Sequence, residues 1–328
     1  MKRLPVALNG PTDPGPKVVA LGGGHGLAST LTALRRVTDQ ITAVVGVADD
    51  GGSSGRLRGE FGILPPGDLR MALAALCGDD TWGRTWQRVI QHRFGGSGEL
   101  SGHSLGNLLI TALWEETGDP VAGLEWVGAL LEAQGRVLPC SLQPLEIVAQ
   151  VRGVNPHSQD VITEVRGQVE IASTPGSVVS ISLEPSRPQA CPQAVDAVRD
   201  AEVIILGPGS WFTSVLPHLL IPDLAKAIIE SPAQRILVMN VAPHEDTETA
   251  GIPVAEHLDF LRAAAPAIRL DAVIADPRHI EDADALRHAC AGFGAQLVLE
   301  QVAYSRGERP GAHDPDRLAV AFRTSLLG

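Results

Sequence analysis

Residues 17–27 read KVVALGGGHGL, and this stretch decides the fold class of the chain. A short apolar run, 17–21, ends in a glycine turn, and a helix-like stretch follows to about Val37. A second apolar run, 43–48, ends in two aspartates. A strand, a glycine turn, a helix and a second strand form a βαβ unit, which has parallel strands and binds ligands at their carboxyl ends. We therefore predict an α/β protein with a Rossmann-like core.

The second half of the chain repeats this order of elements. The apolar run 202–206 leads into Gly-Pro-Gly-Ser at 207–210, and further strands are predicted at 235–239 and 271–275. We expect these strands to join the first two in one mainly parallel sheet.

The middle of the chain has a different pattern. Apolar residues recur at helical spacing over 68–133, which predicts packed helices. From 136 to 184 the pattern is extended, with strands predicted at 161–171 and 178–183. We interpret about 80–200 as an insertion of helices and a small β-layer within the Rossmann-like core.

Composition and charge argue against a nucleic-acid-binding protein and against a membrane-spanning protein. The domain is expected to span 17–328, after a flexible lead-in, 1–16, that is rich in proline and glycine. A net charge of −12 argues against binding of nucleic acid through a basic face. No apolar run approaches the ~20 residues of a membrane helix, so we expect a cytoplasmic protein without an integral membrane segment. The spacing of the four cysteines and ten histidines predicts no disulfide framework and no zinc site.

Two glycine turns are candidate anion sites. Each follows a strand and precedes a helix, where glycine lets the backbone approach a ligand and the helix start offers N–H groups. The candidate residues are Gly23, Gly24, His25 and Gly26 in the first turn and Gly207, Gly209 and Ser210 in the second. The first turn lacks the Gly-x-Gly-x-x-Gly spacing of dinucleotide enzymes. Tight turns that hold no ligand are the alternative.

The segment 49–56, DDGGSSGR, carries the groups that a nucleotide needs. A carboxylate can accept from ribose hydroxyls or bind a metal ion, while hydroxyls, glycine amides and an arginine can hold phosphate. The candidate residues are Asp49, Asp50, Ser53, Ser54 and Arg56. A solvated turn is the alternative interpretation.

Two helix starts add polar candidates. Asp68 begins a helix, and capping that helix explains it as well as ligand binding does. His103 and Asn107 are four residues apart, which places them on one helical face that suits a binding cleft. Ordinary capping with a surface Asn107 is the equal alternative.

Five motifs together resemble one known family. They are LGGGHGL at 21–27, VADDGGSSGRLR at 47–58, PPGDLR at 65–70, HSLGNL at 103–108 and LGPGS at 206–210. In this order they resemble the YvcK family of gluconeogenesis factors, which is related to the CofD 2-phospho-lactate transferases. The resemblance covers about residue 17 to the end.

The resemblance implies a cytoplasmic protein that binds a UDP-sugar and supports cell shape and growth on gluconeogenic carbon sources. It implies no required cofactor and no settled catalytic activity, and it leaves open a homodimer and partners from cell-wall synthesis. It adds Asn240 to the candidate ligand contacts. His25 stands where family members usually have Thr, and Pro243-His244 where many have Thr-Gln.

Three functions compete. The first is a regulatory protein that binds a nucleotide-sugar, with the glycine turns near the phosphates, Asp50 near the ribose and Asn107 near the polar head group. The second is a CofD-like transferase that moves a phospho-acyl group from a nucleotide diphosphate donor, with Mg²⁺ held by Asp49 or Asp50. The third, a nicotinamide oxidoreductase, is disfavoured by the glycine spacing and the lack of a proton donor.

Overall fold

The computed structural model describes residues 15–155, 157–241, 249, 251–305, 309 and 311–327. The expected lead-in therefore lies mostly outside the described residues. Its last two residues are held by hydrogen bonds, because Gln40 Nε2 donates to the carbonyl of Gly15 and Thr38 Oγ1 donates to that of Pro16. Pro243 and His244, which follow Asn240, also lie outside the described residues.

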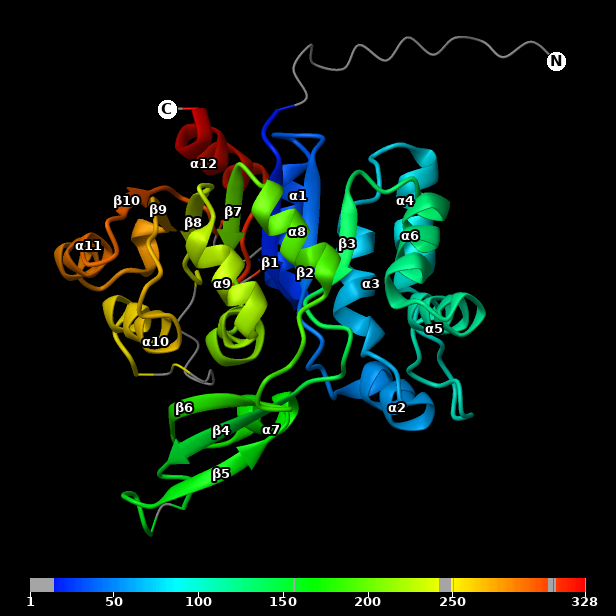
Figure 1. The fold of residues 1–328 in the computed structure, drawn as a ribbon, viewed down its shortest axis with the longest axis horizontal. Coiled ribbons are helices and arrows are strands. Elements are labelled where there is room, and N and C mark those ends of the chain that lie inside the picture. The colour runs from blue at the N-terminus through cyan, green and yellow to red at the C-terminus, as the bar shows by residue number, and fades with distance from the viewer. Residues whose placement is uncertain are drawn as a thin grey trace.

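Seven parallel strands form the central sheet, in the order β10-β9-β8-β7-β1-β2-β3 (Figure 1). This arrangement confirms the predicted Rossmann-like α/β core. The strands are β1 (Val18–Gly22), β2 (Ile41–Val45), β3 (Arg136–Pro139), β7 (Val203–Leu206), β8 (Gln234–Val238), β9 (Ala272–Ala275) and β10 (Gln296–Leu299).

The strand order places a topological switch between β1 and β7. The chain passes from β1 to β2 on one side, and it returns to pair β7 with the other side of β1. In open α/β sheets, ligands bind at such a point, beyond the carboxyl ends of the strands. The two predicted glycine turns follow these two neighbouring strands.

Helices cover both faces of the sheet (Figure 1). Helix α1 packs with α3 and α12 on one face, while α8 and α9 pack together on the other. The helices on these faces are α1 (Gly24–Leu34), α3 (Pro66–Ala75), α8 (Pro192–Asp200), α9 (Pro222–Glu230), α10 (His257–Ala264), α11 (Ala283–Ala291) and α12 (Pro315–Leu327).

The predicted helical region lies between β2 and β3. It contains α2 (Gly52–Phe61), α3, α4 (Thr81–Gln91), α5 (Leu105–Thr117) and α6 (Pro120–Leu131). The range expected for the insertion, about 80–200, also contains β3. This strand belongs to the main sheet, because it pairs in parallel with β2.

A small antiparallel sheet, which we call the β-module (residues 146–184), extends from the carboxyl end of the main sheet (Figure 1). Its strands are β4 (Glu146–Arg152), β5 (Ile162–Arg166) and β6 (Ser177–Glu184), in the order β5-β4-β6. The predicted strand 161–171 is wrong beyond Arg166. Gly167 adopts a positive φ of 87° and starts the short helix α7 (Gln168–Ser173), since the extended backbone cannot continue through that conformation.

No single helix among the described residues is long and apolar enough to cross a membrane. One bent pair, Trp211–Leu220 with Pro222–Glu230, meets the length and composition of a span only when it is summed across an 83° bend.

Candidate functional site

The two glycine turns lie in contact at the switch point. A Cβ atom placed on Gly26 would overlap the carbonyl oxygen of Pro208 and would lie 3.1 Å from the backbone nitrogen of Gly209. Thr30 of α1 also donates a hydrogen bond of 3.3 Å to the carbonyl of Gly207. The segments after β1 and β7 therefore form one continuous backbone surface, although Thr30 and Gly207 are 177 residues apart in sequence.

The start of α1 carries no side-chain cap. Its N-cap residue is Gly23, and no side chain of the first turn is acidic. The predicted ligand residue His25 lies in this first turn and is exposed. Helix N-termini of this kind bind anions through N–H groups and the helix dipole.

Asn240 and Ser210 hold the second turn from behind. Asn240 Oδ1 accepts from the backbone N–H of Gly209 at 2.9 Å, and Asn240 Nδ2 donates to the carbonyl of Gly209 at 2.9 Å. Ser210 Oγ accepts from the backbone N–H of Thr213 at 3.1 Å and caps the π-helical turn Trp211–Val215. The structure thus places Asn240 as a support of the turn.

Asp68 points at the start of α1. Of the two alternatives that the sequence left for Asp68, capping of its own helix is wrong. The N-cap of α3 is Pro65, and Asp68 lies within the first turn. A Cβ atom on Gly23 would overlap Asp68 Oδ2, and the nearby backbone N–H of Gly24 acts to lower the pKa of the Asp68 carboxyl. The carboxylate of Asp68 therefore occupies the position at α1 that suits an anion.

Asp49 lies beside Asp68. Its Oδ2 would be 3.0 Å from a Cβ atom on Gly67, the neighbour of Asp68, and Ser54 Oγ would overlap the same atom. Burial and the Asp49 carboxylate raise the pKa of Asp68 to about 7, against the opposing effects of the Gly24 N–H and the Arg70 guanidinium. The repulsion between two neighbouring carboxylates is relieved when they share a proton or a divalent cation.

Asp50 turns away from Asp49 toward the β-module. Its Oδ1 accepts a hydrogen bond of 3.1 Å from the backbone N–H of Val169, at the start of α7. A Cβ atom on Gly167 would overlap Asp50 Oδ2. The predicted ribose contact is therefore engaged in connecting the 49–56 loop to the β-module.

Ser53, His103 and Asn107 come together although the sequence separates them by about 50 residues. Ser53 Oγ lies 3.0 Å from His103 Nδ1, and it accepts hydrogen bonds from Asn107 Nδ2 at 3.0 Å and from the backbone N–H of Ser104 at 3.4 Å. A hydroxyl has two lone pairs and one proton. Both lone pairs of Ser53 Oγ accept hydrogen bonds from N–H groups. The hydroxyl proton of Ser53 can therefore donate a hydrogen bond to His103 Nδ1.

With the Asn107 amide oriented so that Nδ2 faces Ser53, this count assigns His103 as neutral, with its proton on Nε2. Burial and the nearby Arg56 lower the pKa of His103, which agrees with the neutral form. All three side chains in this cluster are buried. Asn107 Oδ1 is also buried and has no hydrogen-bond partner among the described residues.

Arg56, the predicted phosphate contact, instead holds the loop before His103. Its Nη2 donates to the carbonyl of Ser101 at 2.7 Å and its Nη1 to the carbonyl of Glu99 at 3.4 Å. The site therefore presents backbone N–H groups in place of a basic patch.

Three residues at the site were missed by sequence reasoning. Arg70 is buried behind Asp68, and its Nη1 donates to Gln91 Oε1 at 2.7 Å and to Ser104 Oγ at 3.1 Å. Ser214 Oγ would lie 3.7 Å from a Cβ on Gly23 and 3.8 Å from one on Gly209. Val169 contributes the N–H that Asp50 binds. Of these three, only Arg70 could have been found from the sequence, because it is a charged residue next to the apolar positions of a predicted helix.

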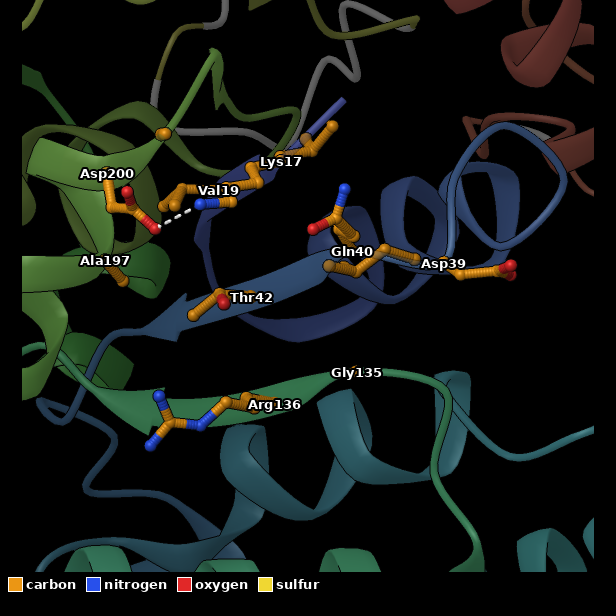
Figure 2. Close-up of a pocket in the computed structure, with 12 residues that line it drawn as sticks. Lys17, Val19, Asp39, Gln40, Thr42, Gly135, Arg136, Ala197 and Asp200 are labelled. Atoms are coloured by element: carbon orange, nitrogen blue, oxygen red, sulfur yellow. Dashed lines mark hydrogen bonds and ion pairs between the residues drawn. The ribbon is translucent and has the colours of Figure 1, made fainter. Parts of the chain in front are cut away.

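A separate groove of about 330 Å³ lies at the opposite, amino end of strands β1 to β3 (Figure 2). Its two cations are already paired: Lys17 Nζ lies 2.8 Å from Asp200 Oδ2, and Arg136 Nη2 lies 2.7 Å from Glu125 Oε1. Both cations of the groove are thus engaged, and the groove lacks the glycine turns that lie at the carboxyl end of the sheet.

Comparisons with known proteins agree with this fold. The family model described as "2-phospho-L-lactate transferase CofD" matches residues 18–300. A "Putative gluconeogenesis factor" of Mycobacterium leprae (strain TN) is 49% identical over 318 residues, which cover 95% of this chain and 87% of the relative. A "Gluconeogenesis factor" of Bacillus subtilis (strain 168) is 35% identical over 267 residues, which cover 81% of this chain and 80% of the relative.

A solved structure is similar over nearly the whole chain. The crystal structure of a UPF0052 family member from Bacillus halodurans superposes with a TM-score of 0.83 at 31% identity. The match covers 94% of this chain and 98% of that protein.

Proposed function

Because the chain belongs to the CofD family, and within it to the gluconeogenesis factors, we propose that it binds a nucleotide diphosphate sugar, of the UDP-sugar class, at the switch point of the sheet. The observation that carries this proposal is the contact between the two glycine turns. A diphosphate has two anionic groups, and the fused turns offer backbone N–H groups from two chain segments. In this proposal the protein is a cytoplasmic regulator that supports cell shape and growth on gluconeogenic carbon sources.

Electrostatics support recognition through the backbone. The chain carries a net charge of −12, and Arg56 of the 49–56 segment already donates hydrogen bonds to two carbonyl groups. An anionic ligand therefore depends on N–H groups and helix starts. It must also displace or neutralise Asp68, which fills the position at α1.

Calorimetry tests this function. UDP-N-acetylglucosamine and UDP-glucose are expected to bind the full chain with one site per chain, and NAD is expected to bind more weakly. UMP, which lacks the second phosphate of UDP, should bind at least tenfold more weakly than UDP, because only one turn can then be satisfied. No binding of any UDP-sugar at millimolar concentration would refute the proposal.

The pairing of Asp49 with Asp68 favours a second candidate, a CofD-like transferase. Mg²⁺ is commonly bound by one or two carboxylates together with substrate phosphates, so these two residues fit the ion. Bound there, the ion would neutralise charge on a diphosphate. Turnover of a nucleotide-linked phospho-acyl donor with a deazaflavin acceptor, strictly dependent on magnesium, would establish this activity. UDP-sugar binding without any turnover would favour the regulator.

A further inference from the structure

Helix α4 is held to the molecule along a narrow line. Only Gly83 and Ile90 of its eleven residues are buried. Trp82 of α4 is 45% exposed, and Trp126 of α6 is 63% exposed. Aromatic side chains are enriched at the surfaces where proteins bind one another.

The outer face of α4 is hollowed. Thr81, Arg84, Thr85 and Arg88 follow helical spacing and therefore lie on one face. They line a depression of about 350 Å³, and Thr85 and Arg88 also border a second one of about 380 Å³. We call the two depressions together the α4 groove.

The two halves of the α4 groove differ in chemistry. The first is lined by polar and basic side chains. The second is lined in part by the apolar side chains of Val89, Phe94 and Leu105, with His92 against Phe94 at a ring distance of 5.4 Å. Such a groove can take charged groups at one end and an apolar side chain at the other.

Two of the residues that line the groove, Arg84 and Arg88, are basic. Within the described residues neither of them forms an ion pair, unlike Arg35 and Arg136 on the neighbouring elements. The side chain of Arg84 makes only a long hydrogen bond of 3.4 Å to the carbonyl of Asp80. Two unpaired cations beside an apolar hollow are complementary to two carboxylates next to an apolar side chain.

We propose that the α4 groove is a docking site for an acidic peptide segment of a partner protein, with a Leu or Phe anchor in the hollow lined by Val89, Phe94 and Leu105. Arg84 and Arg88 are one helical turn apart, about 6 Å along the axis. Two residues of extended chain span about 6.6 Å, so acidic residues at alternate positions can face both arginines. The anchor then follows the second acidic residue.

The concave shape favours a peptide over a flat bilayer, because side chains can enter the hollows. The net charge of −12 disfavours a second copy of the chain, since two copies repel each other at long range. This site is independent of the proposed nucleotide-sugar site, so either one can fail without the other.

A displayed library of random 12-residue peptides tests the proposal on the full chain. We expect enrichment of segments with two acidic residues at alternate positions followed by Leu or Phe. The double variant Arg84→Glu with Arg88→Glu should weaken a selected peptide at least tenfold, and added salt should weaken it on the wild-type protein. Thr85→Trp, which fills the groove without a change in charge, should also weaken it.

The matched control is Arg187→Glu with Arg269→Glu, which makes the same change in charge at exposed positions away from α4 and should leave peptide binding unchanged. Four results would overturn the proposal. They are no acidic enrichment, equal binding to the groove variants, adsorption of the protein to phosphatidylglycerol vesicles through this face, and a dimer in solution that the groove variants dissociate.

Discussion

His103 is the residue whose chemical state the hydrogen bonds define most closely. With Asn107 Nδ2 facing it, Ser53 Oγ accepts hydrogen bonds from two N–H groups, so its hydroxyl donates a hydrogen bond to His103 Nδ1. The opposite tautomer would require Asn107 to turn its amide around, so that Oδ1 accepts from Ser53. The two arrangements therefore predict opposite positions for one proton on the imidazole ring.

The first prediction concerns this proton. Nitrogen-15 NMR of the imidazole ring should show His103 neutral at pH 7, with the proton on Nε2. Ser53→Ala should remove the acceptor for Asn107 Nδ2 and lower the free energy of unfolding by about 1–3 kcal/mol. Ser173→Ala, an exposed helical serine, is the matched control and should change stability little. A proton on Nδ1 in the wild-type protein would contradict the assignment.

The second prediction concerns Asp68, whose pKa is raised to about 7. The folded state holds this proton between about pH 4 and pH 7, while the unfolded state releases it, so Asp68 lowers stability as the pH rises through that window. Asp68→Asn should therefore gain stability relative to wild type from pH 4 to pH 7. The expected gain is about 1–2 kcal/mol, since Asp68 is only partly buried.

Urea unfolding at several pH values measures the effect, with exposed Asp160→Asn as the control. A stability difference between Asp68→Asn and wild type that does not change with pH would show that Asp68 is ionised in the folded protein throughout.

The third prediction belongs to the contact between the glycine turns. Gly26→Ala places a methyl group against the carbonyl of Pro208 and must push the two turns apart. We expect a loss of stability of about 2–3 kcal/mol and a loss of UDP-sugar binding. Gly59→Ala in α2 is the matched control, because its Cβ meets nothing within 4 Å; it should stabilise the protein by about 0.5–1 kcal/mol. Equal effects of the two changes would contradict the close contact.

The fourth prediction concerns the connection between the 49–56 loop and the β-module. Asp50→Ala removes the acceptor for the Val169 N–H, which is a capping interaction worth about 1 kcal/mol. Amides of 167–173 should exchange hydrogen about fivefold faster, while those of β1 keep their rates. Unchanged exchange in α7 would mean that Asp50 does not hold the β-module.

At the level of elements, periodicity predicted most of the strands and helices. The apolar runs at 17–21 and 202–206 became β1 and β7, because buried parallel strands read as continuous apolar stretches. Periodicity gave no sign of α7, since Val161 to Ile171 alternates well enough for a strand. Gly167 ends that strand through its positive φ, which the spacing of apolar residues does not encode, and the Asp50 carboxylate that binds α7 is distant in sequence.

Across the whole molecule, the fifth prediction concerns acid stability. His218 and His313 are buried and bind the carbonyls of Val44 and Met239, and burial lowers the pKa of each to about 4. The unfolded state takes up these protons first, so stability is lost as the pH falls from about 6.5 to 4, by up to about 3 kcal/mol for each histidine. His218→Gln should flatten this loss in urea unfolding. An equal loss in the variant would exclude His218 as a source.

The sequence predicted the architecture and the two glycine turns, because both follow from local patterns and the order of elements. It could not predict which side chains meet across the site. Asp49 lies beside Asp68 because of how α3 packs on the sheet. Asp50 points toward α7 because of where the β-module packs. Asp49 and Asp50 are adjacent in the same motif, but their side chains lie in two different environments.

The central claim is that one ligand bridges both glycine turns, and a crystal structure with UDP-N-acetylglucosamine tests it most directly. The diphosphate should lie about 3 Å from backbone N–H groups of the 23–26 turn and of the 207–210 turn at once. A diphosphate that contacts only one turn, or that binds away from the switch point between β1 and β7, would contradict the claim.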